Sequence, residues 1–353
     1  MKPQTHTALS WAAYKADNPK VRIRNAAAEL GVSEMELLNS DLSENCIRLK
    51  SDILAILEAL PSLGNVMALT RNEAVVHEVT ATFSSMKMRK QTALYLRPGQ
   101  DTRFFTNQWA YAFAVNEDER RSLQFFDHYG VAVHKVYLVN DSHLDNYLHL
   151  VTEFKNTIQS HVQPMKATLA EPKANTGIDV QVLRERWSQI KNVHEGQQII
   201  NAHNSHRLNV YEALGNEYAI KLPSSVIESA LCSLLEKKAE TMVFVSNNSC
   251  VQSFAGPVNR LLRTGPWFNV LNDRFNLHLN TEQLSQVWLI KKPSDNGFVH
   301  SLNAFDKSNN EVLTMTDNRA KGEQESLLWV ELTDILQYEQ TSKEDINEQL
   351  KSH

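Results

Sequence analysis

The same order of helical and strand-like segments occurs twice along this sequence of 353 residues. Residues 20–60 have the apolar spacing of helices, and residues 64–140 alternate between apolar and polar side chains, as strands do. The pattern is helical again over residues 179–239, and further alternating segments follow. The repeated order predicts an α+β fold with an internal duplication, in which each half has a mostly antiparallel β-sheet flanked by helices.

Two short local matches between the halves support the duplication. Ile23–Leu38 aligns with Ile199–Leu214, and Tyr129–Leu138 aligns with Asn296–Phe305. Because both matches keep the order of the surrounding segments, together they favour a duplicated chain.

One segment has the composition of a linker. Residues 162–178 carry two prolines and a glycine among small polar residues, which favour irregular backbone. We therefore expect an N-terminal α+β repeat over residues 1–161 and a C-terminal α+β repeat over residues 179–353.

Composition and motifs argue against several classes of protein. The net charge of −5 gives no electrostatic footprint for nucleic acid. The three cysteines are far apart and show no CxxC spacing, which argues against a disulfide framework or a zinc site and fits a reducing compartment. The first twenty residues lack an apolar signal segment, and no apolar run approaches the ~18 residues of a membrane span. These features predict a cytoplasmic protein that is not embedded in a membrane.

The stretch 183–211 carries the strongest candidate ligand. Its pattern predicts one long helix, on which Leu183, Trp187 and Ile190 form an apolar stripe and His194 continues it. A histidine in this place is ordinarily a buried residue hydrogen-bonded to a carbonyl group. Alternatively, a neutral imidazole in an apolar wall is suited to bind a metal or a haem iron.

Other candidates are basic or aromatic residues near strand ends. Arg103 begins an aromatic run that includes Phe105, and it could present its donors over a flat aromatic ligand or lie on the surface. Phe244 has the pattern of a core residue. Lys292 and Arg319 could hold paired carboxylates by charge-assisted hydrogen bonds, although solvated side chains are the ordinary reading.

Residues 27–33 resemble the turn of a DNA-binding helix-turn-helix. The helix expected after this turn carries Glu34, Glu36 and Asp41 but no arginine or lysine. Because an acidic helix is repelled by phosphates, the sequence disfavours DNA recognition through this motif.

Taken together, these stretches resemble the HemS/ChuS/HmuS family of cytoplasmic haem-utilisation proteins of Gram-negative bacteria, also called hemin-degrading factors. The resemblance covers nearly the whole chain, and its most specific parts are TALYLRPGQDTRFFTNQWAYAFAV, MVFVSNNSCVQSFAGPV, FNLHLNTEQLSQVWLIKKPSDNGFVHSLNAFD and TDNRAKGE. It implies an internally duplicated α+β fold that binds one haem in a cleft between the halves.

The resemblance also assigns roles to individual residues. The matching positions are His194 as the proximal iron ligand, Arg103 facing the iron from the distal side, Phe105 and Phe244 lining the haem, Lys292 and Arg319 near the propionates, and Arg207 as a pocket arginine. His194 and Arg103 are thereby the expected catalytic residues. The chain departs from the family pattern after the proximal histidine, where Gly196 and Gln197 replace a pair of aromatic residues.

The function that the resemblance implies is to accept imported haem and degrade it to release iron, in the manner of a haem oxygenase. The implied partners are haem, an inner-membrane haem importer in transient contact, and an external electron donor such as an NAD(P)H-dependent reductase, since no flavin or nicotinamide motif is present. One alternative is haem storage and transfer without turnover. A DNA-binding regulator is the less favoured alternative.

Overall fold

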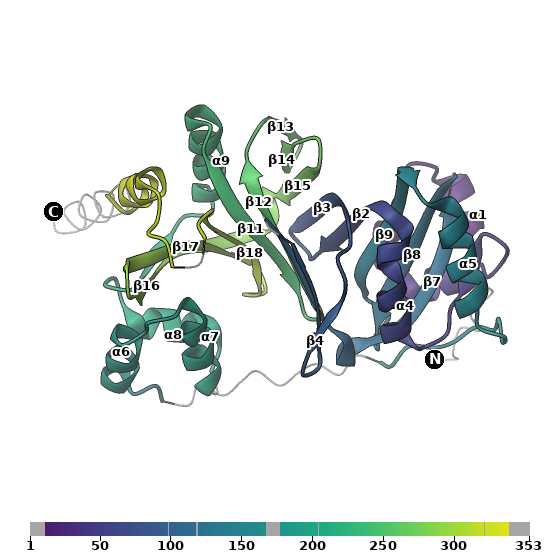
Figure 1. The fold of residues 1–353 in the computed structure, drawn as a ribbon, viewed down its shortest axis with the longest axis horizontal. Coiled ribbons are helices and arrows are strands. Elements are labelled where there is room, and N and C mark those ends of the chain that lie inside the picture. The colour runs from purple at the N-terminus through teal and green to yellow at the C-terminus, as the bar shows by residue number, and fades with distance from the viewer. Residues whose placement is uncertain are drawn as a thin grey trace, which may run out of the picture. The chain divides into compact units, whose positions relative to one another are not determined.

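The computed structural model describes residues 11–97, 99–117, 119–166, 177–203, 205–320 and 322–338. The chain separates into two compact units, whose elements are labelled in Figure 1. The first unit comprises Met1–Arg71, His77–Leu169 and Asn247–Gln252, and the second comprises Asn72–Val76, Ala170–Ser246 and Ser253–His353. Each unit thus includes a short segment from the other half of the sequence.

Helices of the first unit precede and follow its strands. They are α1 (Trp11–Asp17), α2 (Ile23–Leu30), α3 (Glu34–Asn39), α4 (Ile53–Ala59), the 3₁₀ turn η1 (Leu60–Leu63) and α5 (Leu144–Phe154). Gly31 ends α2 with a left-handed φ of 68°, which a glycine adopts without strain. Ser33 begins α3 with a capping box that Glu36 completes. Both helix boundaries follow from local sequence chemistry.

The strands of the first unit are antiparallel. They are β1 (Cys46–Arg48), β2 (Gly64–Arg71), most of β3 (Val75–Thr82), β4 (Lys87–Arg89), β5 (Thr92–Arg97), β6 (Gln100–Phe105), β7 (Trp109–Glu117), β8 (Arg120–Asp127) and β9 (Ala132–Ser142). Six of these strands are neighbours in one sheet, in the order β1-β7-β8-β9-β2-β3. The remaining three are neighbours in a second sheet, in the order β6-β5-β4. A core that includes Leu57, Phe104 and Tyr147 fills the unit.

The second unit has the same arrangement of helices and strands. Its elements are α6 (Val180–Ser188), α7 (Val193–Ala202), α8 (Arg207–Leu214), β10 (Ala219–Leu222), α9 (Val226–Lys237), most of β11 (Glu240–Asn247) and of β12 (Cys250–Pro257), β13 (Leu261–Thr264), β14 (Trp267–Leu271), β15 (Phe275–Asn280), β16 (Leu284–Ser294), β17 (Gly297–Asp306) and β18 (Glu311–Asp317). Residues 327–338 are helical. The strand order β10-β16-β17-β18-β11 reproduces the order β1-β7-β8-β9-β2 of the first unit. The expected α+β fold with an internal duplication is therefore confirmed.

One of the two sequence matches between the halves is wrong in detail. Tyr129–Leu138 lies mainly in β9, whereas Asn296–Phe305 lies in β17. In the repeated strand order β17 corresponds to β8, and β9 corresponds to β18. Both matched segments are glycine-led, alternating strands, and this shared local pattern does not distinguish neighbouring strands of a sheet.

The single long helix expected over residues 183–211 is also wrong, because α6, α7 and α8 are separate helices. The first break precedes α7, where the Glu195 side chain accepts a hydrogen bond from the Lys191 backbone N–H at 3.2 Å. The second break precedes α8, whose N-cap His206 accepts from the backbone N–H of Leu208. Side-chain acceptors next to each break satisfy backbone donors that a continuous helix would use.

The expected linker is only partly within the described residues. Residues 162–166 have no regular secondary structure, whereas residues 167–176 lie outside the described part of the chain. The boundaries of the two repeats stay predictions.

Candidate functional site

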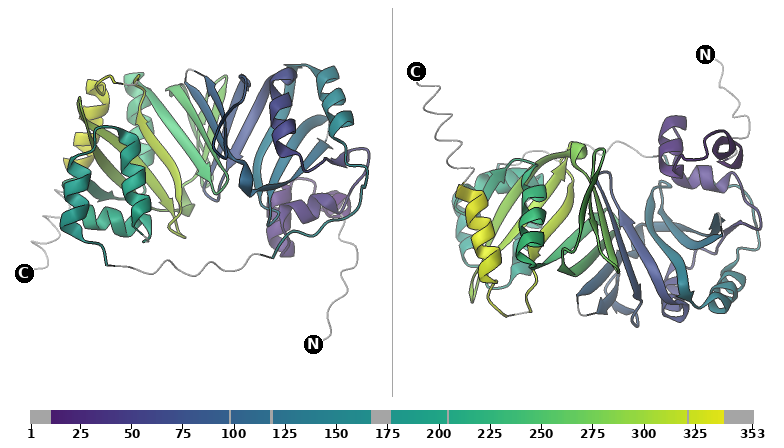
Figure 2. Two further views of the ribbon diagram at one scale, coloured as in Figure 1. Left: turned by 60° about the horizontal axis from the view of Figure 1, so that its bottom comes forward. Right: turned by 90° about the horizontal axis from the view of Figure 1, so that it is seen from above.

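Helices α6, α7 and α8 form the layer that faces β16 in the second unit (Figures 1 and 2). Leu183, Trp187 and Ile190 are buried, as the apolar stripe predicted. They join Trp288 of β16 in one hydrophobic cluster. The indole N–H of Trp187 donates to the Lys291 carbonyl oxygen at 2.9 Å. The helical layer is therefore fixed to the sheet by apolar burial and by a directional contact.

Position 194 is the second residue of α7. The side chain of His194 lies outside the described part of the structure, so its role as a ligand stays a prediction. Two residues later lies Gly196, where an added Cβ would lie 3.4 Å from Lys292 Cε and 3.4 Å from the Trp187 ring. The aliphatic stem of Lys292 therefore packs closely against α7 at Gly196, one of the two positions where the family pattern has an aromatic residue.

A partly buried polar network lies between α8 and strands β17 and β18. Arg207 Nη1 forms an ion pair with Glu311 Oε2 at 2.7 Å. The other carboxylate oxygen of Glu311 accepts from Asn303 Nδ2 at 2.7 Å and from the Thr314 hydroxyl at 2.6 Å. Arg207 Nη1 also donates to the Tyr211 hydroxyl at 3.3 Å. Every oxygen of the Glu311 carboxylate is thus engaged by a fixed donor.

Lys292 belongs to the same electrostatic environment. Burial lowers the pKa of Lys292, the nearby Arg207 charge lowers it further, and Glu311 partly offsets both effects. Burial likewise opposes the charged form of Arg207, but Glu311 and Tyr211 together outweigh it and raise the Arg207 pKa. Within residues 177–203, 205–320 and 322–338, the structure gives Lys292 Nζ no hydrogen-bond or ion-pair partner. This ammonium group is suited to take an anionic ligand.

Phe244 and Arg319 differ in their relation to this network. Phe244 of β11 pairs with Thr314 of β18, so the two side chains lie on the same face of the sheet. Phe244 is partly buried beside the network. Arg319 lies in the loop after β18, where its Nη1 donates to the Glu323 carbonyl oxygen at 2.9 Å. The structure therefore brings together Arg207, Lys292 and Phe244, and among the described residues no hydrogen bond or ion pair joins Arg319 to them.

Arg103 and Phe105 belong to the first unit, on β6. Phe104 between them is fully buried, so alternation turns Arg103 and Phe105 to the opposite, partly exposed face. Asp101 lies two residues before Arg103 on that face. Burial raises the pKa of Asp101, and the charge of Arg103 partly opposes the increase. Arg103 is thus held on a strand beside a carboxylate, in a position to orient a polar group.

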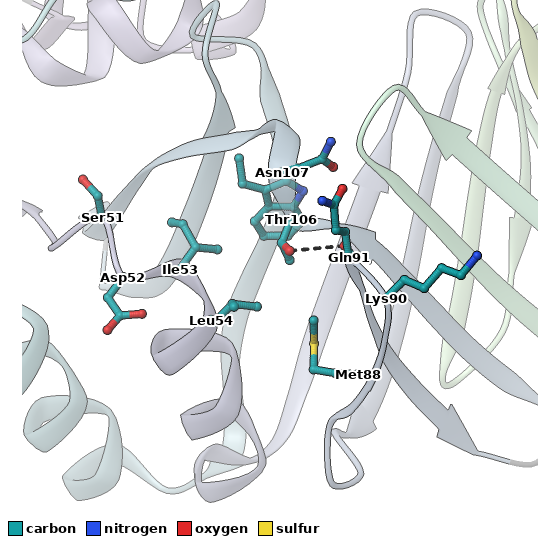
Figure 3. Close-up of a pocket in the computed structure, with 10 residues that line it drawn as sticks. Ser51, Asp52, Ile53, Leu54, Met88, Lys90, Gln91, Thr106 and Asn107 are labelled. Atoms are coloured by element: carbon teal, nitrogen blue, oxygen red, sulfur yellow. Dashed lines mark hydrogen bonds between the residues drawn. The ribbon is translucent and has the colours of Figure 1, made fainter.

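A pocket of about 390 Å³ opens in the first unit beyond the end of β6 (Figure 3). Trp109, Ile53 and Met88 give it an apolar surface, and Lys90 and Asn107 are among its polar lining residues. None of the residues expected to bind a cofactor lines this pocket. Its shape alone does not identify a ligand, and the charged network of the second unit is the more specific chemical feature.

Sequence patterns alone missed Gln197, Tyr211 and Glu311 as parts of the site. Gln197 was singled out only as a departure from the family pattern, yet its Oε1 accepts from Arg207 Nη2 at 2.7 Å. Glu311 begins an alternating strand and had no distinguishing spacing. Glu311 could have been found only as an acidic residue at the start of a strand that pairs with a basic residue on the covering helix. Many acidic residues in a chain meet that description.

Neither membrane-spanning helices nor metal clusters are found in the described part of the chain. No helix there is both long and apolar enough to cross a membrane. Likewise, among the residues that the structure describes, no three His, Cys, Asp or Glu side chains are grouped so that they could hold a metal ion.

The model of the family described as the haemin-degrading HemS.ChuX domain matches the chain twice, over residues 31–154 and 204–336. The hemin transport protein HemS of Yersinia enterocolitica is 34% identical over 320 residues, which cover 89% of this chain and 92% of the relative.

Solved structures also resemble the chain over most of its length. Holo-PhuS, described as a heme-binding protein from Pseudomonas aeruginosa, has a TM-score of 0.86 and 35% identity, and the match covers 91% of this chain and 95% of PhuS. ChuS, described as an E. coli heme oxygenase, has a TM-score of 0.83 and 30% identity, with 93% and 98% covered.

Proposed function

Because the chain belongs to the family of the haemin-degrading HemS.ChuX domain, we propose that it binds haem and degrades it to release iron. The observation that carries this proposal is the position of Lys292, whose aliphatic stem lies against α7 at Gly196, two residues beyond His194. A cation beside an apolar helical layer fits a flat, apolar ligand that bears carboxylates.

The donor set also fits haem chemically. The proposal assigns the axial ligand to His194, a contact with a propionate carboxylate to Lys292 and Arg319, and ring contacts to Phe105 and Phe244. Arg207 is assigned to the lining of the same site. Bound haem would supply redox chemistry at its iron, and the protein supplies binding, orientation and electrostatics.

Arg103 is proposed to act in degradation. Its guanidinium group is always charged and presents several donors in a fixed plane, so it can orient a polar group near the iron. The proposal includes a cytoplasmic location, transient contact with an inner-membrane haem importer, and electrons from an NAD(P)H-dependent reductase.

Haem storage and transfer without turnover is the second candidate function. The observation that favours it is the similarity to a relative named as a hemin transport protein. Degradation is favoured by the similarity to ChuS, which is described as a heme oxygenase.

Absorption spectra of the haem complex separate these functions. The purified chain is titrated with haem, and ascorbate or a reductase with NADPH is then supplied under air and under nitrogen. We expect the Soret band to form and then to lose intensity once reductant is present. A stable Soret band under all conditions would support transfer without turnover, and no Soret shift on titration would contradict haem binding altogether.

We expect His194→Ala to weaken haem binding by about 100-fold, because loss of even an outer-shell partner of a metal ligand costs about 10–100-fold in affinity. The measurement is haem affinity together with the ferric absorption spectrum, which should lose its imidazole-ligated form.

The control for this substitution is His203→Ala. His203 Nε2 is buried without a hydrogen-bond partner among the described residues, so it is the neighbouring imidazole most able to replace His194. If His203→Ala loses the imidazole-ligated spectrum and His194→Ala keeps it, the ligand assignment is wrong.

Arg103→Ala is expected to keep haem binding but to slow degradation by about 100-fold, which is the loss typical of removing one preorganised donor from a reaction. The rate of Soret loss under air with saturating reductant measures this effect. Arg97→Ala is the control, because it removes an arginine from the neighbouring strand β5, and it should leave the degradation rate unchanged. Equal degradation rates in Arg103→Ala and the unmodified chain would remove Arg103 from the mechanism.

A further inference from the structure

Helix α7 depends on tertiary contacts for its position. It has only ten residues, fewer than the roughly 12–15 that an isolated helix needs for marginal stability in water. Ile199 and Ile200 bury one side of it in the hydrophobic cluster of the second unit. The buried apolar face sets the rotation of the helix about its axis only coarsely, because apolar contacts are not directional. Directional contacts on its exposed side restrict that rotation further.

Gln197 makes such a contact on the exposed side of α7. Its Oε1 accepts from Arg207 Nη2 at 2.7 Å, and its Nε2 donates to Asn201 Oδ1 at 2.7 Å. Both ends of the amide are therefore engaged. Because Arg207 begins α8, the first bond joins α7 to a different helix, and the second keeps the Gln197 amide in the orientation that the first bond requires.

Arg207 is in turn fixed to the sheet. Its Nη1 forms the 2.7 Å ion pair with Glu311, the first residue of β18. The second oxygen of Glu311 is held by Asn303 of β17 and Thr314 of β18. A continuous series of charged and polar contacts thus runs from two hydrogen-bonded strands through α8 to α7.

We propose that Gln197, Arg207 and Glu311 form a positioning relay that holds α7, and with it the turn carrying His194, in the orientation needed for iron ligation. Gln197 lies one helical turn beyond position 194, so a rotation of α7 that breaks the Gln197 contact also turns position 194. The purpose of the relay, which is to orient His194, rests on the proposed function. The claim that the relay holds α7 in place concerns the ligand-free chain and does not depend on haem.

Two glutamines next to each other on α7 provide a matched pair of variants. Gln197→Leu removes the relay contact and keeps a similar side-chain volume. Gln198→Leu makes the same chemical change one residue later, at an exposed side chain for which the structure gives no polar contact among its described residues. Both positions are exposed, so both variants are expected to fold.

The first measurement is amide hydrogen exchange of α7 in the ligand-free chain. We expect Gln197→Leu to speed exchange over residues 195–202 by about tenfold, the effect of losing one hydrogen bond to a charged group. Gln198→Leu should leave it unchanged. Equal exchange in the two variants would overturn the relay, whether or not the chain binds haem. If the unmodified chain binds no haem, the proposed function fails, and this measurement still decides the relay.

The second measurement is made on the haem complex. Gln197→Leu should raise the rate at which haem is lost to an excess of a haem-scavenging protein by about tenfold, and it should add a second, weakly ligated form to the ferric spectrum. Gln198→Leu should do neither. An unchanged spectrum and loss rate in Gln197→Leu would show that α7 carries no ligand that depends on this contact, which overturns the proposed purpose of the relay.

Glu311→Gln tests whether the contacts act in series. This variant removes the charge that fixes Arg207 and should reproduce the exchange and spectral effects of Gln197→Leu. In the double variant the two effects should not add, because either substitution interrupts the same relay. Additive effects would show two independent contacts and contradict the relay. If Glu311→Gln fails to fold, the comparison of Gln197→Leu with Gln198→Leu decides alone.

Discussion

Lowering the pH from 6.5 towards 4 is expected to destabilise the first unit steeply, because two histidines are buried there in the neutral form. His77 and His134 are 0% and 1% exposed, and burial lowers the pKa of each to about 3. His134 packs against the ring of Phe104 at a centroid distance of 4.8 Å, and its Nδ1 is 2.9 Å from the Thr70 hydroxyl. Water therefore cannot hydrate either imidazole if it takes up a proton, so the charged form is unfavourable in the folded chain.

The sign of the pH dependence follows from these shifts. In the unfolded chain both imidazoles take up protons below pH 6.5, whereas in the folded chain they stay neutral until about pH 3. The unfolded state thus binds more protons in this range, and stability falls as the pH falls. At about 1.36 kcal/mol per histidine and pH unit, the two together contribute a slope of about 2.7 kcal/mol per pH unit between roughly pH 4 and 6.

Urea unfolding at a series of pH values measures this slope. Replacing one buried histidine, as in His134→Gln, should reduce the slope by about half, whatever its effect on stability at pH 7. His149→Gln is the control, since His149 is largely exposed. An equal slope in His134→Gln and in the unmodified chain would contradict the assignment of acid sensitivity to this buried histidine.

Glu34→Gln is expected to lower the free energy of unfolding by about 3–5 kcal/mol, as breaking a buried charge pair does. Glu34 begins α3 and is 6% exposed, and its carboxylate pairs with Lys135 of β9 and Arg71 of β2. Burial alone would raise the pKa of Glu34, but the two cations outweigh it and hold the pKa below its usual value. The substitution would leave Lys135, which is 5% exposed, charged and without its carboxylate.

The matched control is Glu117→Gln, which removes the carboxylate of a more exposed pair with Lys15. Exposed pairs contribute about 0–1 kcal/mol, so the two variants should differ several-fold in urea unfolding at pH 7. A loss below about 1 kcal/mol for Glu34→Gln would show that the cluster is solvated in the folded chain.

Elements whose burial follows a local period were predictable from the sequence. The strand β2 alternates between buried and less buried residues along its whole length, which is what its pattern of side chains indicated. The end of α2 at Gly31 and the beginning of α3 at Ser33 follow from local sequence, because capping chemistry is contained within a few residues. The duplication was predictable for the same reason, since each half repeats these local signals in one order.

The site was only partly predictable because its contacts join distant parts of the chain. Lys292 and Arg207 could be named from the resemblance, but the Glu311 carboxylate that pairs with Arg207 has no local pattern that marks it. The breaks between α6, α7 and α8 were missed because the helical period continues through them. The side chains of Glu195 and His206 accept backbone N–H groups at the starts of α7 and α8. The match between Tyr129–Leu138 and Asn296–Phe305 was wrong for a similar reason, because neighbouring strands share the same alternating pattern.

The close passage of Lys292 beside Gly196 couples the side chains that these two positions can hold. A methyl group at position 196 would meet the Lys292 stem and the Trp187 ring at 3.4 Å, an ordinary contact distance. A ring there has no such space unless the lysine takes another path. An aromatic residue at position 196 therefore requires a different path for the lysine or a different residue at position 292. The two positions are expected to vary together among related chains.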